Sequence, residues 1–250
     1  MQLFMIQVRL AITDSNIMKN ILTLLLSLVS IVGFSQKETL AHFTAIEIFG
    51  PFEIELIKSD KEAIEMRTIN VDKDDLTVEV NRGELLLKLR TRHFLTDWDS
   101  DKFRNEPRIK TKVYYKDLDE IKIAAGASLK SEEILKSKKF VLEGSMGADL
   151  ELKIQAETIY VRSSMGATLN LQGETDFLEV KANMGAVLNA SRLISKVVFV
   201  KASMGSDANV YASDEVDIEA NMGAIVRYSG EPMVRHTNTK IGADIRRRDH

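Results

Sequence analysis

The 250-residue chain contains no cysteine, only three prolines and a single tryptophan. Without cysteine it can form no disulfide, thiolate metal site, cysteine nucleophile or acylated-cysteine lipid anchor. The formal net charge of −3, with both signs mixed, gives no indication of a nucleic-acid partner. The four histidines are scattered, so no metal-ligand spacing and no Ser/His/Asp arrangement can be built from them. We therefore expect no cofactor and no catalytic residues.

The one long apolar run, Ile21 to Phe34, follows Lys19 and Asn20 and ends before Ser35. A basic residue, an apolar stretch and a small residue at its exit are typical of a secretory signal peptide. The run is shorter than the ~20 residues of a membrane-spanning helix. We predict a signal peptide over residues 1–35, with Met18 as the true start and export to the periplasm or outer cell surface. The alternative is an uncleaved membrane anchor.

A short glycine theme recurs about every 19 residues in the second half of the chain. It occurs in full five times, around Met146-Gly147, Met165-Gly166, Met184-Gly185, Met204-Gly205 and Met222-Gly223. Weaker copies flank the run at Gly126 and Gly242. Regular repetition at this period indicates one structural unit stacked upon itself.

The residues before each glycine alternate strictly between apolar and polar, as in Leu178, Val180, Ala182 and Met184. This period of two predicts strands with one buried face, and it places the methionine on the inward face. Stacked thioethers could also bind copper. We interpret the methionine column instead as a flexible part of the core.

The intervening polar residues fall into rows at equivalent positions of successive units. Stacked strands lie about 4.8 Å apart, so each row is expected to form a ladder on the surface. One row carries Asn170, Asn189 and Asn209, and another carries serine or asparagine two residues before each glycine. A third row mixes charges, which predicts pairing between neighbouring coils.

These patterns predict an all-β fold: a right-handed parallel β-helix, or β-solenoid, with coils of about 19 residues over residues 119–250. Residues 36–118 lack the glycine theme and read as an N-terminal β-strand region with turns at Gly50-Pro51 and Arg82-Gly83. We predict that this region forms an antiparallel β-layer that covers the open end of the stack. The last coil is polar, as expected of a cap.

The layout resembles a known family. The chain has a Phe43-x-x-Ile46-x-Ile48-x-Gly50 opening, a Gly83-Glu84-Leu85 turn, and then β-coils with Gly-Ala at each corner. In this it is similar to the putative auto-transporter adhesin, head GIN domain family, over residues 40 to 245. The resemblance implies a β-helix-like fold and a periplasmic or outer-surface location, and it supplies no catalytic residue.

Two groups of residues are candidates for binding. Asp97, Asp99 and Asp101 alternate as at the start of a calcium loop but lack its glycine and glutamate, so a solvated loop is the alternative. Trp98 in the same segment either contacts a partner or pins the loop to the core. On the outward rows of the repeats, aromatic and basic residues favour a ligand-binding face: Tyr160, Arg162, Lys181, Phe199 and Lys201.

Three functions are compatible with this sequence. The first is an exported, non-enzymatic solenoid that binds a protein or glycan of the cell envelope. The second is a polysaccharide-active enzyme on the same scaffold, which requires two or more unpaired carboxylates in a groove. The third is a structural or assembly role, in which the flat edges of the solenoid pair subunits. The oligomeric state in solution would test this role.

Overall fold

The computed structural model describes residues 37–248 except 70, 72 and 91–107. The predicted signal peptide lies outside the described residues, as do Asp97, Trp98, Asp99 and Asp101. Within the described part of the chain, no helix has the length and apolar character needed to cross a bilayer.

The described residues form sixteen strands and one short 3-10 helix, η2 at Lys73–Asp75. The strands of the first half are β1 (Glu38–Thr39), β2 (Ala45–Phe49), β3 (Phe52–Lys58), β4 (Ala63–Ile69), β5 (Leu76–Asn81), β6 (Glu84–Leu89), β7 (Arg108–Tyr115) and β8 (Glu120–Ala124). Those of the second half are β9 (Ser128–Gly144), β10 (Asp149–Ser163), β11 (Thr168–Ala182), β12 (Val187–Ala202), β13 (Asp207–Ala220), β14 (Ile225–Ser229), β15 (Val234–Thr239) and β16 (Asp244–Arg247).

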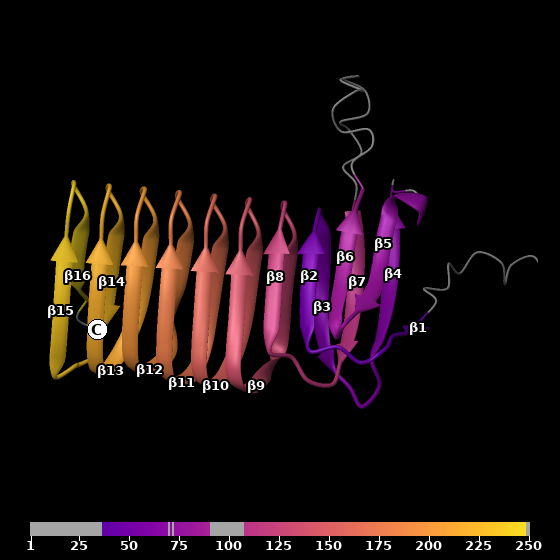
Figure 1. Cartoon of the computed structure of the whole chain (residues 1–250), viewed down its shortest axis with the longest axis horizontal. Helices are drawn as coiled ribbons and strands as arrows, with labels where there is room; N and C mark the ends of the chain where they lie inside the picture. The colour runs from indigo at the N-terminus through magenta and orange to yellow at the C-terminus, as the bar shows by residue number, and fades with distance from the viewer. Residues whose placement is uncertain (1–36, 70, 72, 91–107, 249–250) are drawn as a thin grey trace, which may run out of the picture. The chain divides into compact units, whose positions relative to one another are not determined.

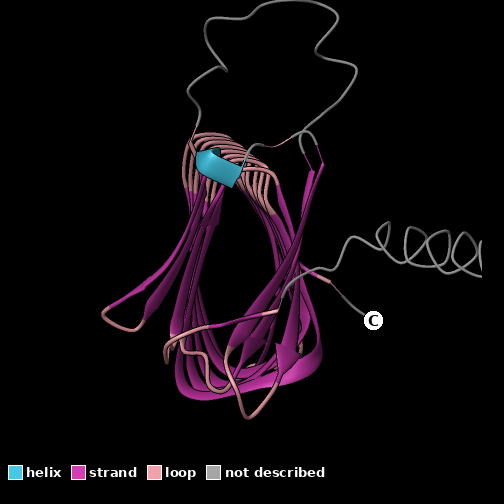
Figure 2. Cartoon of the chain, turned by 90° about the vertical axis from the view of Figure 1, so that its right-hand side faces the viewer, coloured by secondary structure: helices cyan, strands magenta, loops and turns pink. Residues whose placement is uncertain are grey.

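The second half is a stack of parallel coils, as predicted (Figure 1). Strands β9 to β13 are each 14 to 17 residues long, and each pairs in parallel with the strand one coil before it and one coil after it. Every long strand bends, so that it forms both walls of a coil and the rounded edge between them (Figure 2). Followed from β8 to β16 in Figure 1, the chain rises along the near wall and descends along the far wall as it advances, which is a right-handed coil.

Parallel pairing extends into the N-terminal region, further than the sequence patterns indicate. Strand β2 lies between β6 and β8 and pairs in parallel with both, and β3 pairs in parallel with β7 and β9. The antiparallel layer is confirmed in the outermost strands, because β5 pairs with β6, β4 with β7 and β1 with β4. This layer covers the end of the stack, whose strand edges would otherwise be unpaired.

Each coil from β8 to β16 closes through a tight turn in which both central residues have positive φ. At Met146 and Gly147 the φ angles are 51° and 71°, and the Ala148 N–H donates to the Ser145 carbonyl at 3.2 Å. Positive φ at both positions is the signature of a type I′ turn. The pattern repeats at seven successive turns, from Ala125-Gly126 to Ile241-Gly242.

The turn corrects one prediction: the methionines do not point inward. Met146, Met165, Met184, Met204 and Met222 are between 42 and 51% exposed. Alternation of side chains holds only for extended backbone. The left-handed conformation at these residues breaks that alternation and turns the side chain out to solvent.

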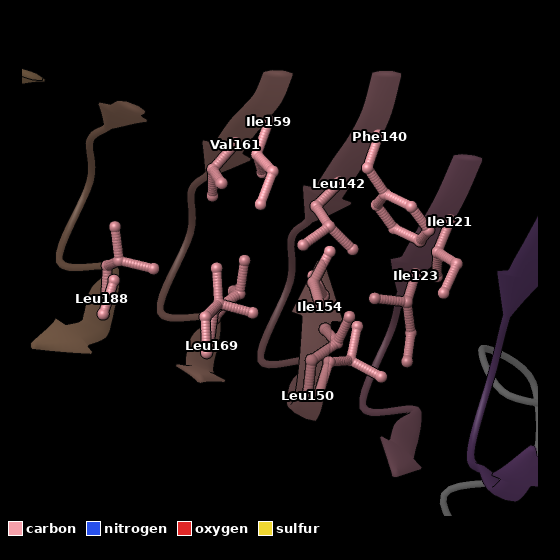
Figure 3. Close-up of a cluster of buried hydrophobic side chains, with 14 of the residues drawn as sticks. Ile121, Ile123, Phe140, Leu142, Leu150, Ile154, Ile159, Val161, Leu169 and Leu188 are labelled. Atoms are coloured by element: carbon pink, nitrogen blue, oxygen red, sulfur yellow. The ribbon is translucent and has the colours of Figure 1, made fainter. Parts of the chain in front are cut away.

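The other inward positions are buried as predicted. Residues seven and five positions before the glycine, such as Leu178 and Val180, are fully buried. So are those one and three positions after it, such as Ala186 and Leu188. These side chains form one continuous core that runs from Phe43 to Tyr228, part of which is shown in Figure 3. A continuous core makes each coil depend on its neighbours for burial.

The coils differ in length, and the differences are absorbed at the rounded edge. Between β12 and β13 the pairing passes directly from Ala190↔Val210 to Ile194↔Tyr211. A second shift follows between Ser195↔Ala212 and Val197↔Glu215, and outside these two shifts the register is regular up to the turns. The glycine turns therefore stay aligned although the repeat varies between 18 and 21 residues.

The C-terminal coil caps the stack, as predicted from its polar residues. Strand β15 pairs with β13, and all of its side chains are exposed. A terminal coil has no neighbour on its outer side, so polar residues are needed there for solubility.

Two glycines give a direct test of this geometry. A Cβ added to Gly173, where φ is 121°, would lie 2.0 Å from the Ile154 carbonyl oxygen, whereas a Cβ added to Gly185 meets nothing within 4 Å. We expect Gly173→Ala to lower the free energy of unfolding by about 3 kcal/mol or more. Gly185→Ala should cost only about 1 kcal/mol, from the left-handed backbone alone. Urea denaturation of both variants measures the difference, and equal losses would contradict the structure.

A second test concerns pH. Tyr115 is 2% exposed, and its burial, with a smaller contribution from the Glu133 carboxylate, raises the pKa of the phenol from 10.0 to about 12. Between these values the unfolded chain loses the proton while the folded chain keeps it, so stability should fall as the pH rises from 10 to 12. Tyr115→Phe should reduce this loss. A variant whose stability falls as steeply as that of the unaltered protein would show that Tyr115 is not responsible.

Candidate binding face

The two walls of the solenoid carry different surface rows. On the wall that follows each turn, Asn189 Nδ2 donates to Asn170 Oδ1 at 2.9 Å, and Asn209 Nδ2 donates to Asn189 Oδ1 at 3.2 Å. The predicted asparagine ladder is therefore confirmed. Its amides are used in holding neighbouring coils together.

The wall that precedes each turn carries three aromatic rings on its outer surface. Tyr160, Phe177 and Phe199 come from β10, β11 and β12, and all three are partly exposed. The ring centroids of Tyr160 and Phe177 are 6.3 Å apart, and those of Phe177 and Phe199 are 5.5 Å apart. We call these three residues the aromatic cluster. Lys139 adds a cation, because its Nζ lies 5.1 Å from the centroid of the Tyr160 ring.

The predicted basic residues lie beside the aromatic cluster, but each is paired with a carboxylate. Arg162 bonds Glu143 on the preceding coil. Lys181 Nζ lies 2.6 Å from Glu179 on its own strand, and Lys201 Nζ lies 3.4 Å from Glu219 on the following coil. Exposed pairs of this kind contribute little to stability. They do neutralise the basic row, so the aromatic cluster is the distinctive feature of this wall.

A groove of about 710 Å³ lies at the bend next to the aromatic cluster. It crosses four consecutive strands, β9 to β12, at equivalent positions of each coil. We call it the axial groove. Its lining residues are Lys136, Ser137, Lys138, Gln155, Ala156, Glu157, Glu174, Thr175, Asp176, Ile194 and Lys196.

The axial groove has a buried floor, and charged residues stand along its sides. Ala156 and Thr175 on the floor are buried, and the Thr175 hydroxyl donates to the carbonyls of Glu157 and Phe177 at 3.2 and 3.1 Å. On the sides, Lys196 Nζ lies 2.7 Å from Asp176, and this contact raises the pKa of the lysine. Asp176 directly precedes Phe177, so the groove and the aromatic cluster form one continuous surface.

The structure brings together all five residues predicted on the repeats: Tyr160, Arg162, Lys181, Phe199 and Lys201. It adds Phe177, which sequence reasoning missed. Phe177 stands eight residues before its glycine, a position occupied by Lys139, Thr158 and Val197 in other coils, so no uniform row revealed it. The axial groove was also missed, since it depends on where the strands bend.

The described residues contain no group of three or more His, Asp or Glu side chains that could hold a metal ion. The acidic segment at Asp97, Asp99 and Asp101 and the neighbouring Trp98 lie outside the described residues. For that segment, calcium binding and partner contact stay predictions.

The stacked coils, the glycine turns and the capping layer together agree with one family model. The model for the putative auto-transporter adhesin, head GIN domain, matches residues 42–232. The chain belongs to this family. A comparison with curated proteins finds no match.

Solved structures share the fold. A putative adhesin from Bacteroides fragilis is 14% identical, with a TM-score of 0.73, and the match covers 85% of this chain and 95% of that one. A putative lipid binding protein from Parabacteroides distasonis, 14% identical, has a TM-score of 0.63 over 86% of this chain and 96% of its own. A putative adhesin from Parabacteroides merdae, 15% identical, has a TM-score of 0.63 over 86% and 95%. At these identities the likeness shows the fold alone.

Proposed function

We propose that this protein is an exported, non-enzymatic binding protein of the cell envelope. Its ligand is an extended glycan chain that lies along the stack, on the aromatic cluster and in the axial groove. The single observation that carries the proposal is the aromatic cluster. Three partly exposed rings lie side by side on the outer face of the sheet, whereas the inward-facing apolar side chains of the same strands are buried.

The geometry of the surface favours a linear ligand. The aromatic cluster crosses three strands and the axial groove crosses four, so both run in the direction of stacking. Aromatic rings offer a large, rigid contact area, and the polar side chains beside them can bond hydroxyl groups. Because acidic and basic residues are balanced along the groove, the expected glycan is uncharged.

Binding is favoured over hydrolysis by the state of the carboxylates in the groove. A glycosidase needs two carboxyl groups free to act on the scissile bond. In the axial groove, Glu174 accepts a hydrogen bond from Gln155, and Asp176 pairs with Lys196. These contacts occupy two of the three acidic side chains that line it. Family membership among adhesins and the predicted signal peptide support the envelope location.

The proposal predicts that removal of the rings weakens binding. We expect Tyr160→Ala combined with Phe177→Ala and Phe199→Ala to weaken binding to immobilised neutral polysaccharides by about tenfold or more. Affinity electrophoresis in the presence of each polysaccharide measures the change. Phe49→Ala is the matched control, because Phe49 is a partly exposed aromatic on β2, outside the aromatic cluster and the lining of the axial groove.

Three results would contradict the proposal. One is a triple variant that binds polysaccharides as well as the Phe49→Ala control does. Another is release of reducing ends from the polysaccharide, which would show turnover and favour the enzymatic alternative. Binding of an envelope protein, but of no polysaccharide, would also overturn the glycan assignment.

A further inference from the structure

The exposed methionines at the turns form a row that the core does not explain. We call Met146, Met165, Met184, Met204 and Met222 the methionine ridge. They occupy the same position in five successive turns, and each is close to half exposed. Hydrogen bonds from the Gly147 N–H to the Met165 carbonyl, and their equivalents, hold these turns one above the other at 3.0 to 3.1 Å. The side chains therefore project in register along one edge of the solenoid.

Methionine is an unfavourable residue at this position. The φ angles of the five methionines lie between 49° and 53°. Type I′ turns prefer asparagine, aspartate or glycine at their first central position, and a left-handed residue with a Cβ costs about 1–2 kcal/mol. The same cost recurs at five turns, although about half of each side chain stays exposed to solvent. Strain that recurs at an exposed position indicates a function for the side chain.

The chemistry of the ridge suits a soft monovalent metal ion. Thioether sulfur is a neutral, polarizable donor of the kind that selects Cu(I). Neighbouring strands are about 4.8 Å apart, close to the ~4.6 Å spanned by two metal–sulfur bonds of about 2.3 Å. The flexible methionine side chain can adjust the remaining difference.

The surroundings of the ridge are compatible with a cation. In the five methionine turns, the residue before methionine is Ser or Asn, and the residue after glycine is Ala or Ser. No lysine or arginine therefore stands within the four residues of any of these turns. The flanking turns carry Ala125 and Ile241 in place of methionine, which limits the sulfur donors to the five central coils.

We propose that the methionine ridge binds Cu(I), each ion being held by thioethers of adjacent coils. The ridge lies at the tight turns, whereas the axial groove lies at the rounded bend. The proposal is thus independent of glycan binding, and either can fail without the other.

Titration of the protein with Cu(I) under anaerobic conditions tests the proposal directly. With ¹³C-labelled methionine methyl groups, we expect the resonances of the ridge to shift and that of Met233 to stay in place. Met233 is an isolated methionine that is 88% exposed, so it controls for non-specific thioether contact. Equal shifts of Met233 and the ridge, or no shift at all, would overturn the proposal.

Substitution gives a second, independent readout. Met165→Leu combined with Met184→Leu and Met204→Leu keeps apolar side chains of similar size but removes three central sulfurs. Competition with a chromophoric Cu(I) chelator should show that the triple variant binds Cu(I) at least about tenfold more weakly. Removing a residue that only supports a metal ligand already has an effect of about this size. Met233→Leu should bind as the unaltered protein does. A triple variant that retains full affinity would show that the ridge acts through its apolar surface and not through sulfur.

Discussion

The whole structure depends on the backbone hydrogen bonds that join one turn to the next. From Gly126 to Gly223, the glycine N–H at each turn donates to the carbonyl of the methionine, or of Ile241, one coil later, as from Gly185 to Met204 at 3.0 Å. A turn held in this way fixes the register of the walls on both sides of it. With a period of two, a slip by one residue would expose the inward leucines and bury the charged rows. The glycine turn is therefore the element that keeps the core inside.

Fixed register also creates the surface. Equivalent positions of successive coils lie side by side, so whatever residues occupy them become a row. This explains the amide ladder of Asn170, Asn189 and Asn209, the contact between Phe177 and Phe199, and the methionine ridge. The rows differ in what remains available to a ligand. The amides of the ladder bond one another, whereas the rings and the thioethers face solvent.

Much of this architecture could be predicted from the sequence, because alternation and the glycine period are local signals. The orientation of the methionines could not, since alternation fails where φ becomes positive. The coils formed by β2, β3, β6 and β7 carry no methionine-glycine pair, and β2 lies between strands that follow it in the chain. The axial groove was also hidden from the sequence, because nothing in a straight strand pattern marks where the strand bends. The aromatic face was predicted in part, from Tyr160 and Phe199, without the central Phe177.

The alignment of the coils can be measured directly by disulfide formation, since the natural chain contains no cysteine. Thr168 and Val187 are register partners in β11 and β12, and Asn189 lies two residues further along β12. A disulfide requires Cα atoms closer than about 7 Å, a distance that adjacent strands satisfy only near the correct register. Cysteines at 168 and 187 should therefore link rapidly in the folded protein, whereas cysteines at 168 and 189 should not. Preferential linkage of the second pair would show that the coils are not aligned by their turns.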